Sequence, residues 1–214
     1  NTKELSILGL SGVYNQILID GLPNIDGLNY TYGVSAIPGT LINKIHISQG
    51  LASVLQGHES LTGQINIELK ENNNKNTFFL NYYMNSFLAK QVNIDYNFKL
   101  KNWRSIASLH ATRPSRKIDN NNDNFLDLPL IKKLSFYNKW IYGLKEETGL
   151  YSAITIRFLS ENRIGGEIDF NPQEDKGSDE AYGQTVSFNQ PEIYMKSSYL
   201  FKNGNSFIFN TSLS

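Results

Sequence analysis

The sequence predicts a compact α+β domain followed by antiparallel β-strands that cross a membrane as part of a barrel. Three observations carry this prediction. Residues 1–71 are rich in glycine and in short apolar runs. From residue 77 onward, apolar and polar residues alternate with a period of two, as they do in strands that have one apolar and one polar face. The links between these strands alternate between tight and long.

The composition excludes several classes of protein. The chain has 214 residues, and its 20 lysine and arginine residues balance 20 aspartate and glutamate residues. Because electrostatic binding of nucleic acid needs a basic surplus, we expect no nucleic-acid partner. The absence of cysteine excludes disulfide scaffolds, thiolate metal sites and cysteine nucleophiles. No apolar run approaches the roughly 18 residues of a membrane-spanning helix.

Residues 1–71 form the first predicted domain. The chain begins at Asn1 without a methionine or an apolar leader, so we expect any export signal to have been removed or to lie outside this segment. Residues 51–57 predict one or two helical turns. Residues 63–69 predict a strand with its isoleucines and Leu69 on one face and its polar side chains on the other.

Residues 77–214 form the second predicted domain, which holds about seven strands. In the clearest strand, 92–101, every even position is apolar and every odd position is polar or charged. Lys99 and Lys101 share one face of this strand and, with Arg104, are expected to line the lumen. Weaker copies at 78–84, 103–112, 134–145, 150–159, 193–202 and 207–213 are each close to the roughly 9–11 residues of a tilted membrane-spanning strand.

The links between the predicted strands favour a membrane barrel. After a medium link at 85–91 they are tight at 101–102, 146–149 and 203–206, and long at 113–133 and 160–192. Outer-membrane barrels combine short periplasmic turns with long extracellular loops. An ordinary soluble antiparallel sheet is the alternative. Aromatic residues near the strand ends predict interfacial girdles; they are Tyr82, Tyr83, Trp103, Tyr137, Trp140, Tyr142, Tyr194 and Tyr199.

Seven strands are too few to close a barrel that could enclose residues 1–71. The open edges of such a sheet would seek partners. We therefore expect the chain to be an N-terminal portion of a longer protein.

Four pieces of residues 7–70 carry a resemblance to a known family. Their order and spacing resemble the plug domain of TonB-dependent outer-membrane receptors, in which a glycine and a Ser-x-x-x-Gly turn precede a Gly-Gly-x-Ile-Asn-Ile strand that enters the barrel. The sequences at 57–69 and at 125–129 are most similar to those of receptors from Bacteroidetes-type bacteria. The four pieces are Ile7-Leu8-Gly9-Leu10, Ile17 to Pro23, Ile37-Pro38 with Ile45-His46-Ile47, and 50–57 with Thr62-Gly63-Gln64-Ile65-Asn66-Ile67.

The resemblance implies a plug domain that is incomplete at its N-terminus, followed by the first of the 22 strands of a complete family barrel, in the cell outer membrane. It implies a protein that is not an enzyme and needs no cofactor. Such a receptor imports a scarce nutrient by energy-coupled plug rearrangement, and the nutrient is a siderophore-iron complex, haem, cobalamin, a peptide or a glycan. The implied partners are a TonB-type inner-membrane complex, the small nutrient ligand, outer-membrane lipid and a surface lipoprotein.

The sequence departs from the family pattern at three positions of the plug. His46, Gln49 and Gln56 stand where the family usually has glutamate, arginine and tyrosine. Ion pairs between plug and barrel through these positions are therefore not implied. The segment that contacts the energy-transducing partner precedes the first plug strand in this family, and nothing before Leu5 resembles it.

The loop at 119–127 predicts a calcium site. Asp119, Asn121, Asp123 and Asp127 place oxygen atoms at positions 1, 3, 5 and 9 of a calcium-type loop. Position 6 is Asn124 in place of glycine, although asparagine adopts the left-handed conformation that this position needs. Position 12 is a leucine in place of a bidentate glutamate. A solvated, asparagine-rich loop is the alternative hypothesis.

Other chemically active residues have simpler interpretations. The three histidines show no metal-ligand spacing. Ser53, His58 and Glu59 lack the strand-turn-helix elbow of a hydrolase. The acidic run at 169–180 is typical of solvated surface, with capture of a cationic or metal-bearing ligand as the alternative.

Two rival functions stay open from the sequence. One is a plugged outer-membrane barrel that acts as an assembly or adhesion component and docks a partner protein through its long loops. The other is a soluble β-rich binding module. In the transport interpretation, ligand contacts come from the plug apex and from the two long loops, 113–133 and 160–192.

Overall fold

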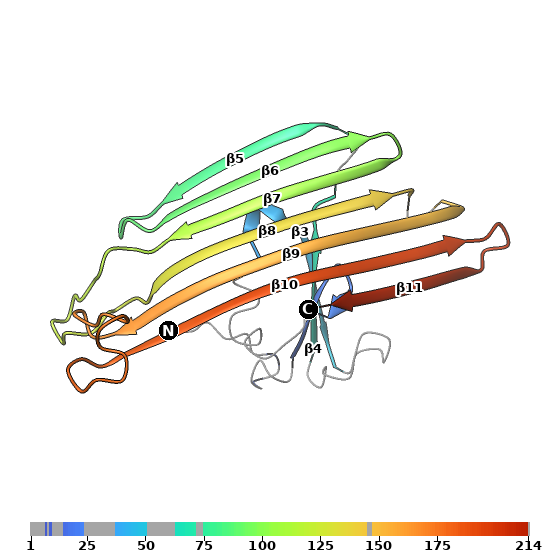
Figure 1. Cartoon of the computed structure of the whole chain (residues 1–214). Helices are drawn as coiled ribbons and strands as arrows, with labels where there is room; N and C mark the ends of the chain where they lie inside the picture. The colour runs from blue at the N-terminus through green and yellow to red at the C-terminus, as the bar shows by residue number, and fades with distance from the viewer. Residues whose placement is uncertain are drawn as a thin grey trace. The chain divides into compact units, whose positions relative to one another are not determined.

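The computed structural model describes Ile7, Gly9 and residues 15–23, 37–50, 63–71, 75–144 and 147–213 (Figure 1). The chain divides into two compact units, Asn1–Glu71 and Asn72–Ser214. The helical turns predicted at 51–57 lie outside the described residues. Within the described part of the chain, no helix has the length and apolar character needed to cross a membrane.

The first unit contains a four-stranded sheet of mixed direction with the order β2-β1-β4-β3. β1 and β2 form a tight hairpin whose two central residues, Asp20 and Gly21, have φ values of 52° and 80°. Positive φ at both positions gives the turn the right-handed twist of its strands, and Asp-Gly is a preferred pair there. The elements are β1 (Asn15–Ile19), β2 (Leu22–Pro23), the 3-10 turn η3 (Gly39–Leu41), β3 (Ile42–Gln49) and β4 (Gly63–Leu69).

The core of this unit is formed by β1, β4 and η3. Leu18 and Leu41 are 0% and 1% exposed, and Ile67 of β4 is 1% exposed, as its predicted face requires. On the other face of β4, Gln64 is also buried. Its side-chain amide donates a hydrogen bond to Oε1 of Gln16 on the parallel strand β1, at 3.3 Å, so the polar group is satisfied.

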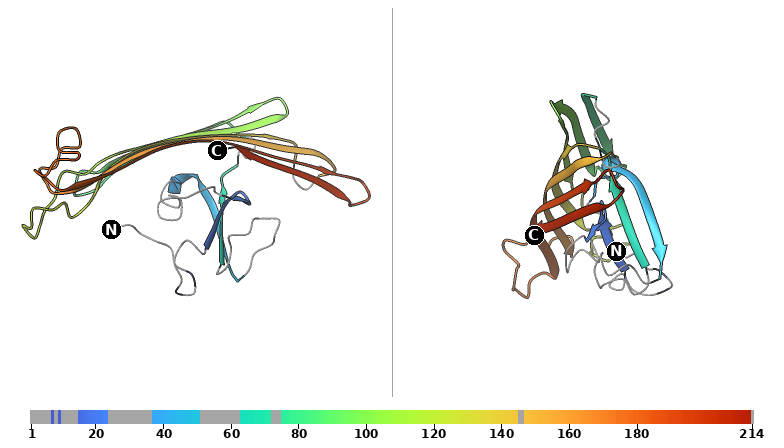
Figure 2. Two further views of the ribbon diagram at one scale, coloured as in Figure 1. Left: turned by 60° about the horizontal axis from the view of Figure 1, so that its bottom comes forward. Right: turned by 90° about the vertical axis from the view of Figure 1, so that its right-hand side faces the viewer.

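The second unit is a seven-stranded antiparallel sheet in which neighbours in sequence are neighbours in space (Figure 1). The prediction of a compact domain followed by antiparallel strands is confirmed. Figure 2 shows that the sheet is bent along its strands. The strands are β5 (Thr77–Met84), β6 (Lys90–Leu100), β7 (Trp103–Arg113), β8 (Leu130–Tyr142), β9 (Gly149–Gly166), β10 (Gly183–Leu200) and β11 (Ser206–Leu213).

The long loops are shorter than the sequence predicts. β9 and β10 remain paired from Leu200 opposite Gly149 as far as Gly183 opposite Gly166, so the link between them is 167–182. Beyond residue 160 the positions that continue the apolar face include Ser160, Asn162 and Ser187, and this mixture of polar and apolar residues interrupts the period-two signal. Likewise β8 begins at Leu130, so the preceding link is 114–129.

The two faces of the sheet differ in chemistry. Leu80, Ile94, Leu109, Phe136 and Phe158 form one row across β5 to β9, because each is the register partner of the next. Leu80 is 59% exposed and Leu109 is 39% exposed, as expected for side chains that contact lipid. The intervening residues of each strand point to the opposite, polar face.

Tyr137 and Tyr194 do not belong to an interfacial girdle. They are 3% and 6% exposed, and their register partners are Arg157 and Thr155 on the polar face. The girdle assignment of these two tyrosines is therefore wrong. Aromatic character near a predicted strand end does not by itself indicate which face the ring occupies, because one residue of register reverses the face.

Candidate functional site

The polar face of β8, β9 and β10 carries a cluster of buried ion pairs. Arg157 pairs with Glu192 across β9 and β10. Glu161 pairs with Arg163 on its own strand, and its Oε2 lies 3.9 Å from Nζ of Lys133 on β8. Both glutamates are 2% exposed. Charges at this depth are stable only when paired, so the cluster holds the three strands in one register.

A second polar cluster lies on the same face of β6 and β7. Oγ of Ser108 donates to Asp95 at 2.6 Å, and Nδ1 of His110 lies 2.6 Å from Oδ1 of Asn93. The other ring nitrogen of His110 lies 2.9 Å from Oγ1 of Thr112. Both ring nitrogens of His110 are therefore engaged by neighbouring side chains, consistent with the lack of metal-ligand spacing in the sequence.

The two long loops, 114–129 and 167–182, contact each other. Phe125 forms an isolated antiparallel bridge with Glu167, and its ring centroid lies 6.3 Å from that of Tyr182. The backbone amide of Ile168 donates to the carbonyl of Asn124 at 2.9 Å, and Nζ of Lys117 donates to the carbonyl of Ile168. These contacts make one ordered surface from two segments that are distant in sequence.

A pocket of about 500 Å³ opens within the loop at 167–182. Its wall includes the aromatic residues Phe170 and Tyr182, the acidic residues Asp175 and Asp179, and Lys176. The acidic run predicted at 169–180 therefore contributes to a concave surface. Such a pocket, partly aromatic and partly charged, is the kind of surface that binds small ligands.

In the predicted calcium loop, the carboxylates accept hydrogen bonds from other residues of the same loop. The two carboxylate oxygens of Asp119 accept hydrogen bonds from the backbone amides of Asp123 and Asn124, at 3.2 and 3.0 Å. Oδ2 of Asp123 accepts from the side-chain amide of Asn121 at 2.8 Å. Oδ2 of Asp127 accepts from the amide of Asn120 at 3.0 Å.

The backbone of this loop has the left-handed geometry that the sequence suggests for position 6. Asn124 has a φ of 67° and Asn122 has a φ of 57°. Among the residues that the structure describes, no group of three or more histidine, cysteine, aspartate or glutamate side chains is arranged to hold a metal ion. Calcium binding by Asp119, Asn121, Asp123 and Asp127 stays a prediction.

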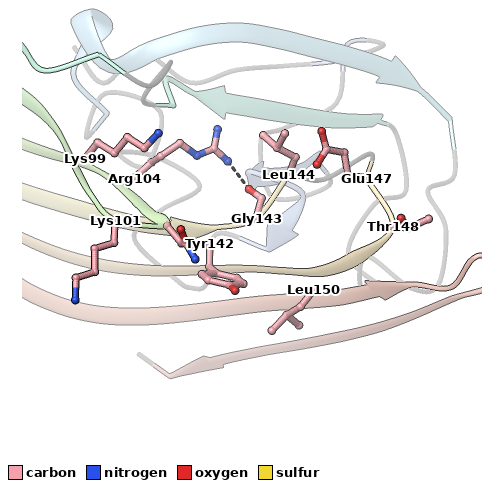
Figure 3. Close-up of a pocket in the computed structure, with 10 residues that line it drawn as sticks. Lys99, Lys101, Arg104, Tyr142, Gly143, Leu144, Glu147, Thr148 and Leu150 are labelled. Atoms are coloured by element: carbon pink, nitrogen blue, oxygen red, sulfur yellow. Dashed lines mark hydrogen bonds between the residues drawn. The ribbon is translucent and has the colours of Figure 1, made fainter.

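A third polar site lies at the end of the sheet that carries the tight turns (Figure 3). Lys99 and Arg104 are register partners and line a pocket of about 520 Å³, where Nη2 of Arg104 donates to the carbonyl of Gly143 at 2.6 Å. Lys101 also lines this pocket, but the prediction that it shares a face of the strand with Lys99 is wrong. β6 ends at Leu100, and Lys101 has a φ of 53°, which turns its side chain away from Lys99 (Figure 3).

In the first unit, His46 lies on the exposed face of β3. Its Nε2 is 3.3 Å from Oε2 of Glu68 on β4. The hydrogen bond with His46 is the main cause that lowers the pKa of the Glu68 carboxyl from its usual value. His46 is therefore a polar cross-strand partner within the sheet of the first unit, as expected from its isolation in the sequence.

The sequence could have suggested the opposite charges of Arg157 and Glu192 but not their contact. Arg157 stands at a polar position of the predicted strand 150–159, whereas Glu192 falls in the predicted link 160–192. Their pairing depends on the register of β9 and β10, and the loss of alternation predicts a longer link, 160–192, between these strands. With the link at 167–182, the register of β9 and β10 places the two residues opposite each other.

Known proteins with a similar sequence or fold are outer-membrane receptors. The family TonB-dependent Receptor Plug Domain matches residues 1–64. No curated protein matches the chain significantly. Among solved structures, FpvA of Pseudomonas aeruginosa in complex with a heterologous ferric pyoverdine is 14% identical with a TM-score of 0.68, over 95% of this chain and 28% of that one.

Two further solved structures share the fold. The ferripyoverdine receptor of the P. aeruginosa outer membrane, bound to ferripyoverdine, is 16% identical with a TM-score of 0.66, over 96% of this chain and 28% of that one. The ferric-catecholate import receptor Fiu of E. coli K12 is 10% identical with a TM-score of 0.66, over 99% of this chain and 33% of that one. The chain thus spans a third or less of the length of these three structures.

Proposed function

The chain belongs to the TonB-dependent outer-membrane receptors, of which it holds the plug domain and adjoining barrel strands, and from this we propose that the whole protein imports a scarce nutrient. The ligand binds from outside to the plug and the long loops. An energy-transducing inner-membrane complex of the TonB type then rearranges the plug so that the ligand passes. No covalent chemistry is involved.

The observation that carries the proposal is the order of the parts in one chain. A plug-family domain at residues 1–64 directly precedes a meander of seven antiparallel strands. A barrel large enough to contain such a domain would form an open aqueous channel without it. A folded stopper at the start of a barrel is useful to a transporter that opens only when energy is supplied.

The surface that the loops offer supports a choice of the nutrient class to test first. The pocket at 167–182 is lined by aromatic residues and by charged residues of both signs, Asp175, Asp179 and Lys176. FpvA and Fiu are a pyoverdine-bound and a ferric-catecholate receptor, and they share the fold with this chain. Ferric siderophores are therefore the first class to test, followed by haem, cobalamin, peptides and glycans.

The test is uptake of a labelled nutrient panel by a strain that lacks the full-length gene, by its parent and by the complemented strain, each with and without a protonophore. The proposal predicts one nutrient whose uptake is lost in the deletion strain, is restored by the gene and is abolished by the protonophore in the parent. Uptake that survives the protonophore contradicts energy coupling.

The rival is an outer-membrane component that docks a partner protein through its loops without transport. The ordered contacts between Phe125 and Glu167, and between Lys117 and Ile168, give this rival its support, because they present one continuous loop surface. A deletion strain with unchanged uptake of every nutrient, and a partner protein that co-purifies only with intact loops, would favour docking.

A further inference from the structure

Four basic residues line one pocket at the end of the sheet that carries the long loops. The pocket has a volume of about 640 Å³ and its wall is formed by Lys90, Arg113, Arg116 and Lys132 with Leu88 and Pro114. No acidic residue contributes to the wall. All four cations are exposed, and none has an ion pair with any carboxylate in the described part of the chain.

Three of these cations form a row across β6, β7 and β8. Lys90 is the register partner of Arg113. Thr112, which precedes Arg113, is the partner of Lys133. Lys132 therefore lies beside Arg113 at the end of the same ladder. Like charges placed opposite each other on neighbouring strands are destabilising. An anion bound between them would remove this repulsion.

The row lies on the lipid face of the sheet. Lys90, Arg113 and Lys132 are each two residues from a position of the row formed by Val92, Ala111 and Leu134, which are register partners. Residues two apart in a strand point to the same side. The cations therefore share a face with the exposed apolar side chains, among which Leu134 is 43% exposed and Leu80 is 59% exposed.

The row also marks the outer boundary of the apolar band. Arg113 is the last residue of β7 before the loop at 114–129, and Lys90 is the first residue of β6 after the link at 85–89. Long loops of outer-membrane barrels are extracellular. The row is thus placed at the depth of the outer-leaflet headgroups, directly above side chains that contact acyl chains.

The wall of the pocket is ordered by contacts of its own backbone. The amide of Arg116 donates to the carbonyl of Phe87 at 3.0 Å, which joins the segment after β7 to the link at 85–89. In that link, Asn85 accepts hydrogen bonds from the amides of Phe87 and Ala89 through Oδ1, each at 3.0 Å. Leu88 is held at a φ of 62° and leaves its side chain 49% exposed beside the cations.

From this arrangement we propose that the basic row, Lys90, Arg113 and Lys132 with Arg116, binds the phosphate groups of an outer-leaflet lipid. Arginine and lysine bind phosphate through charge-assisted hydrogen bonds, and basic pockets at a membrane surface bind anionic lipid headgroups. Leu88 and the apolar rows below contact the acyl chains of the same lipid. The site anchors the receptor in the outer leaflet and is separate from the loop surface proposed to bind the nutrient.

The experiment uses the full-length receptor in detergent and native mass spectrometry with three probes: bisphosphorylated lipid A, the same lipid without phosphates, and inorganic phosphate. The parent is expected to bind phosphorylated lipid A. The variant Lys90→Gln/Arg113→Gln/Lys132→Gln is expected to bind it about tenfold more weakly or worse. Heat-dependent gel mobility checks that each variant remains folded.

The matched control removes three exposed lysines at the opposite end of the same sheet. Lys99→Gln/Lys101→Gln/Lys202→Gln loses the same charge and is expected to bind phosphorylated lipid A as the parent does. Equal binding by the parent and the row variant would overturn the proposal, as would equal weakening in both variants. Tight binding of the lipid without phosphates, or displacement of the lipid by equimolar inorganic phosphate, would overturn it as well.

Discussion

Arg157 of β9 and Glu192 of β10 form an ion pair on the polar face of the sheet, where their side chains are 8% and 0% exposed. Glu192 also accepts a hydrogen bond from the side-chain amide of Gln190 at 2.8 Å. The guanidinium of Arg157 lies 5.9 Å from the ring centroid of Tyr194. The pair therefore joins two strands and an aromatic side chain in one buried unit.

Removal of the carboxylate from this unit should be costly. Glu192→Ala leaves the buried guanidinium of Arg157 without its Glu192 partner, and we expect the free energy of unfolding to fall by about 3–5 kcal/mol. Denaturant titration of the full-length protein in lipid vesicles measures this change. Lys202→Ala, in an exposed turn, is the control and should change the free energy of unfolding by less than about 0.5 kcal/mol. A Glu192→Ala variant as stable as the control would show that the pair does not stabilise the sheet.

The contact between His46 and Glu68 predicts a dependence on acid. Because the pKa of Glu68 is lowered in the folded protein, its contribution to stability is present above the ordinary value of 4.5 and is lost as the pH falls through the lowered folded value. The contribution is small, since both side chains are well exposed to solvent. Thermal unfolding of the parent and of Glu68→Gln should differ at neutral pH and converge in acid. A difference that grows in acid has the wrong sign for this account.

The hairpin of β9 and β10 offers a matched pair of glycines. A Cβ atom at Gly183 would overlap the ring of Phe170, which is 7% exposed, whereas a Cβ at Gly165 would meet open space. We expect Gly183→Ala to displace Phe170 and to open the loop at 167–182 to limited proteolysis. Gly165→Ala should leave the cleavage rate unchanged. Equal cleavage of both variants would mean that Phe170 does not order this loop.

Calcium binding at 119–127 is tested by titration of calcium chloride into the full-length protein. The hypothesis predicts that calcium raises the unfolding temperature of the parent and not that of Asp119→Ala/Asp123→Ala. Asp179→Ala/Glu180→Ala, which removes two acids from the other long loop, should respond as the parent does. A parent without any response removes the calcium hypothesis and leaves the hydrogen bonds of Asp119 as the reason for its place in the loop.

The sequence predicted the strands best where one face contacts lipid. In β6 the alternation of Val92, Ile94 and Tyr96 with polar residues fixes both the period and the face. The alternation ends where β9 and β10 leave the apolar layer, although the backbone hydrogen bonds continue to Gly166 and Gly183. In this extension polar and apolar residues are mixed on both faces, so their pattern does not predict the strand.

The candidate functional surfaces are formed by residues that are distant in the sequence, so no local pattern predicts them. The row of Lys90, Arg113 and Lys132 comes from three strands, and no single stretch of sequence is basic. The contact of Phe125 with Glu167 likewise joins two loops through an isolated bridge. Such sites become visible only when the register between strands is known, because the register decides which polar residues meet.

For the receptor to bind its ligand from outside, the strands must cross the outer membrane with the loops at 114–129 and 167–182 on the outer side. The described chain contains no cysteine, so single cysteines can report this arrangement in a full-length receptor without other cysteines. Two exposed lysines form a matched pair, with Lys176 in the long loop and Lys202 in a tight turn. A membrane-impermeant maleimide should label Lys176→Cys in intact cells and Lys202→Cys only after the outer membrane is permeabilised. Labelling of Lys202→Cys in intact cells, or protection of Lys176→Cys until permeabilisation, would contradict the account.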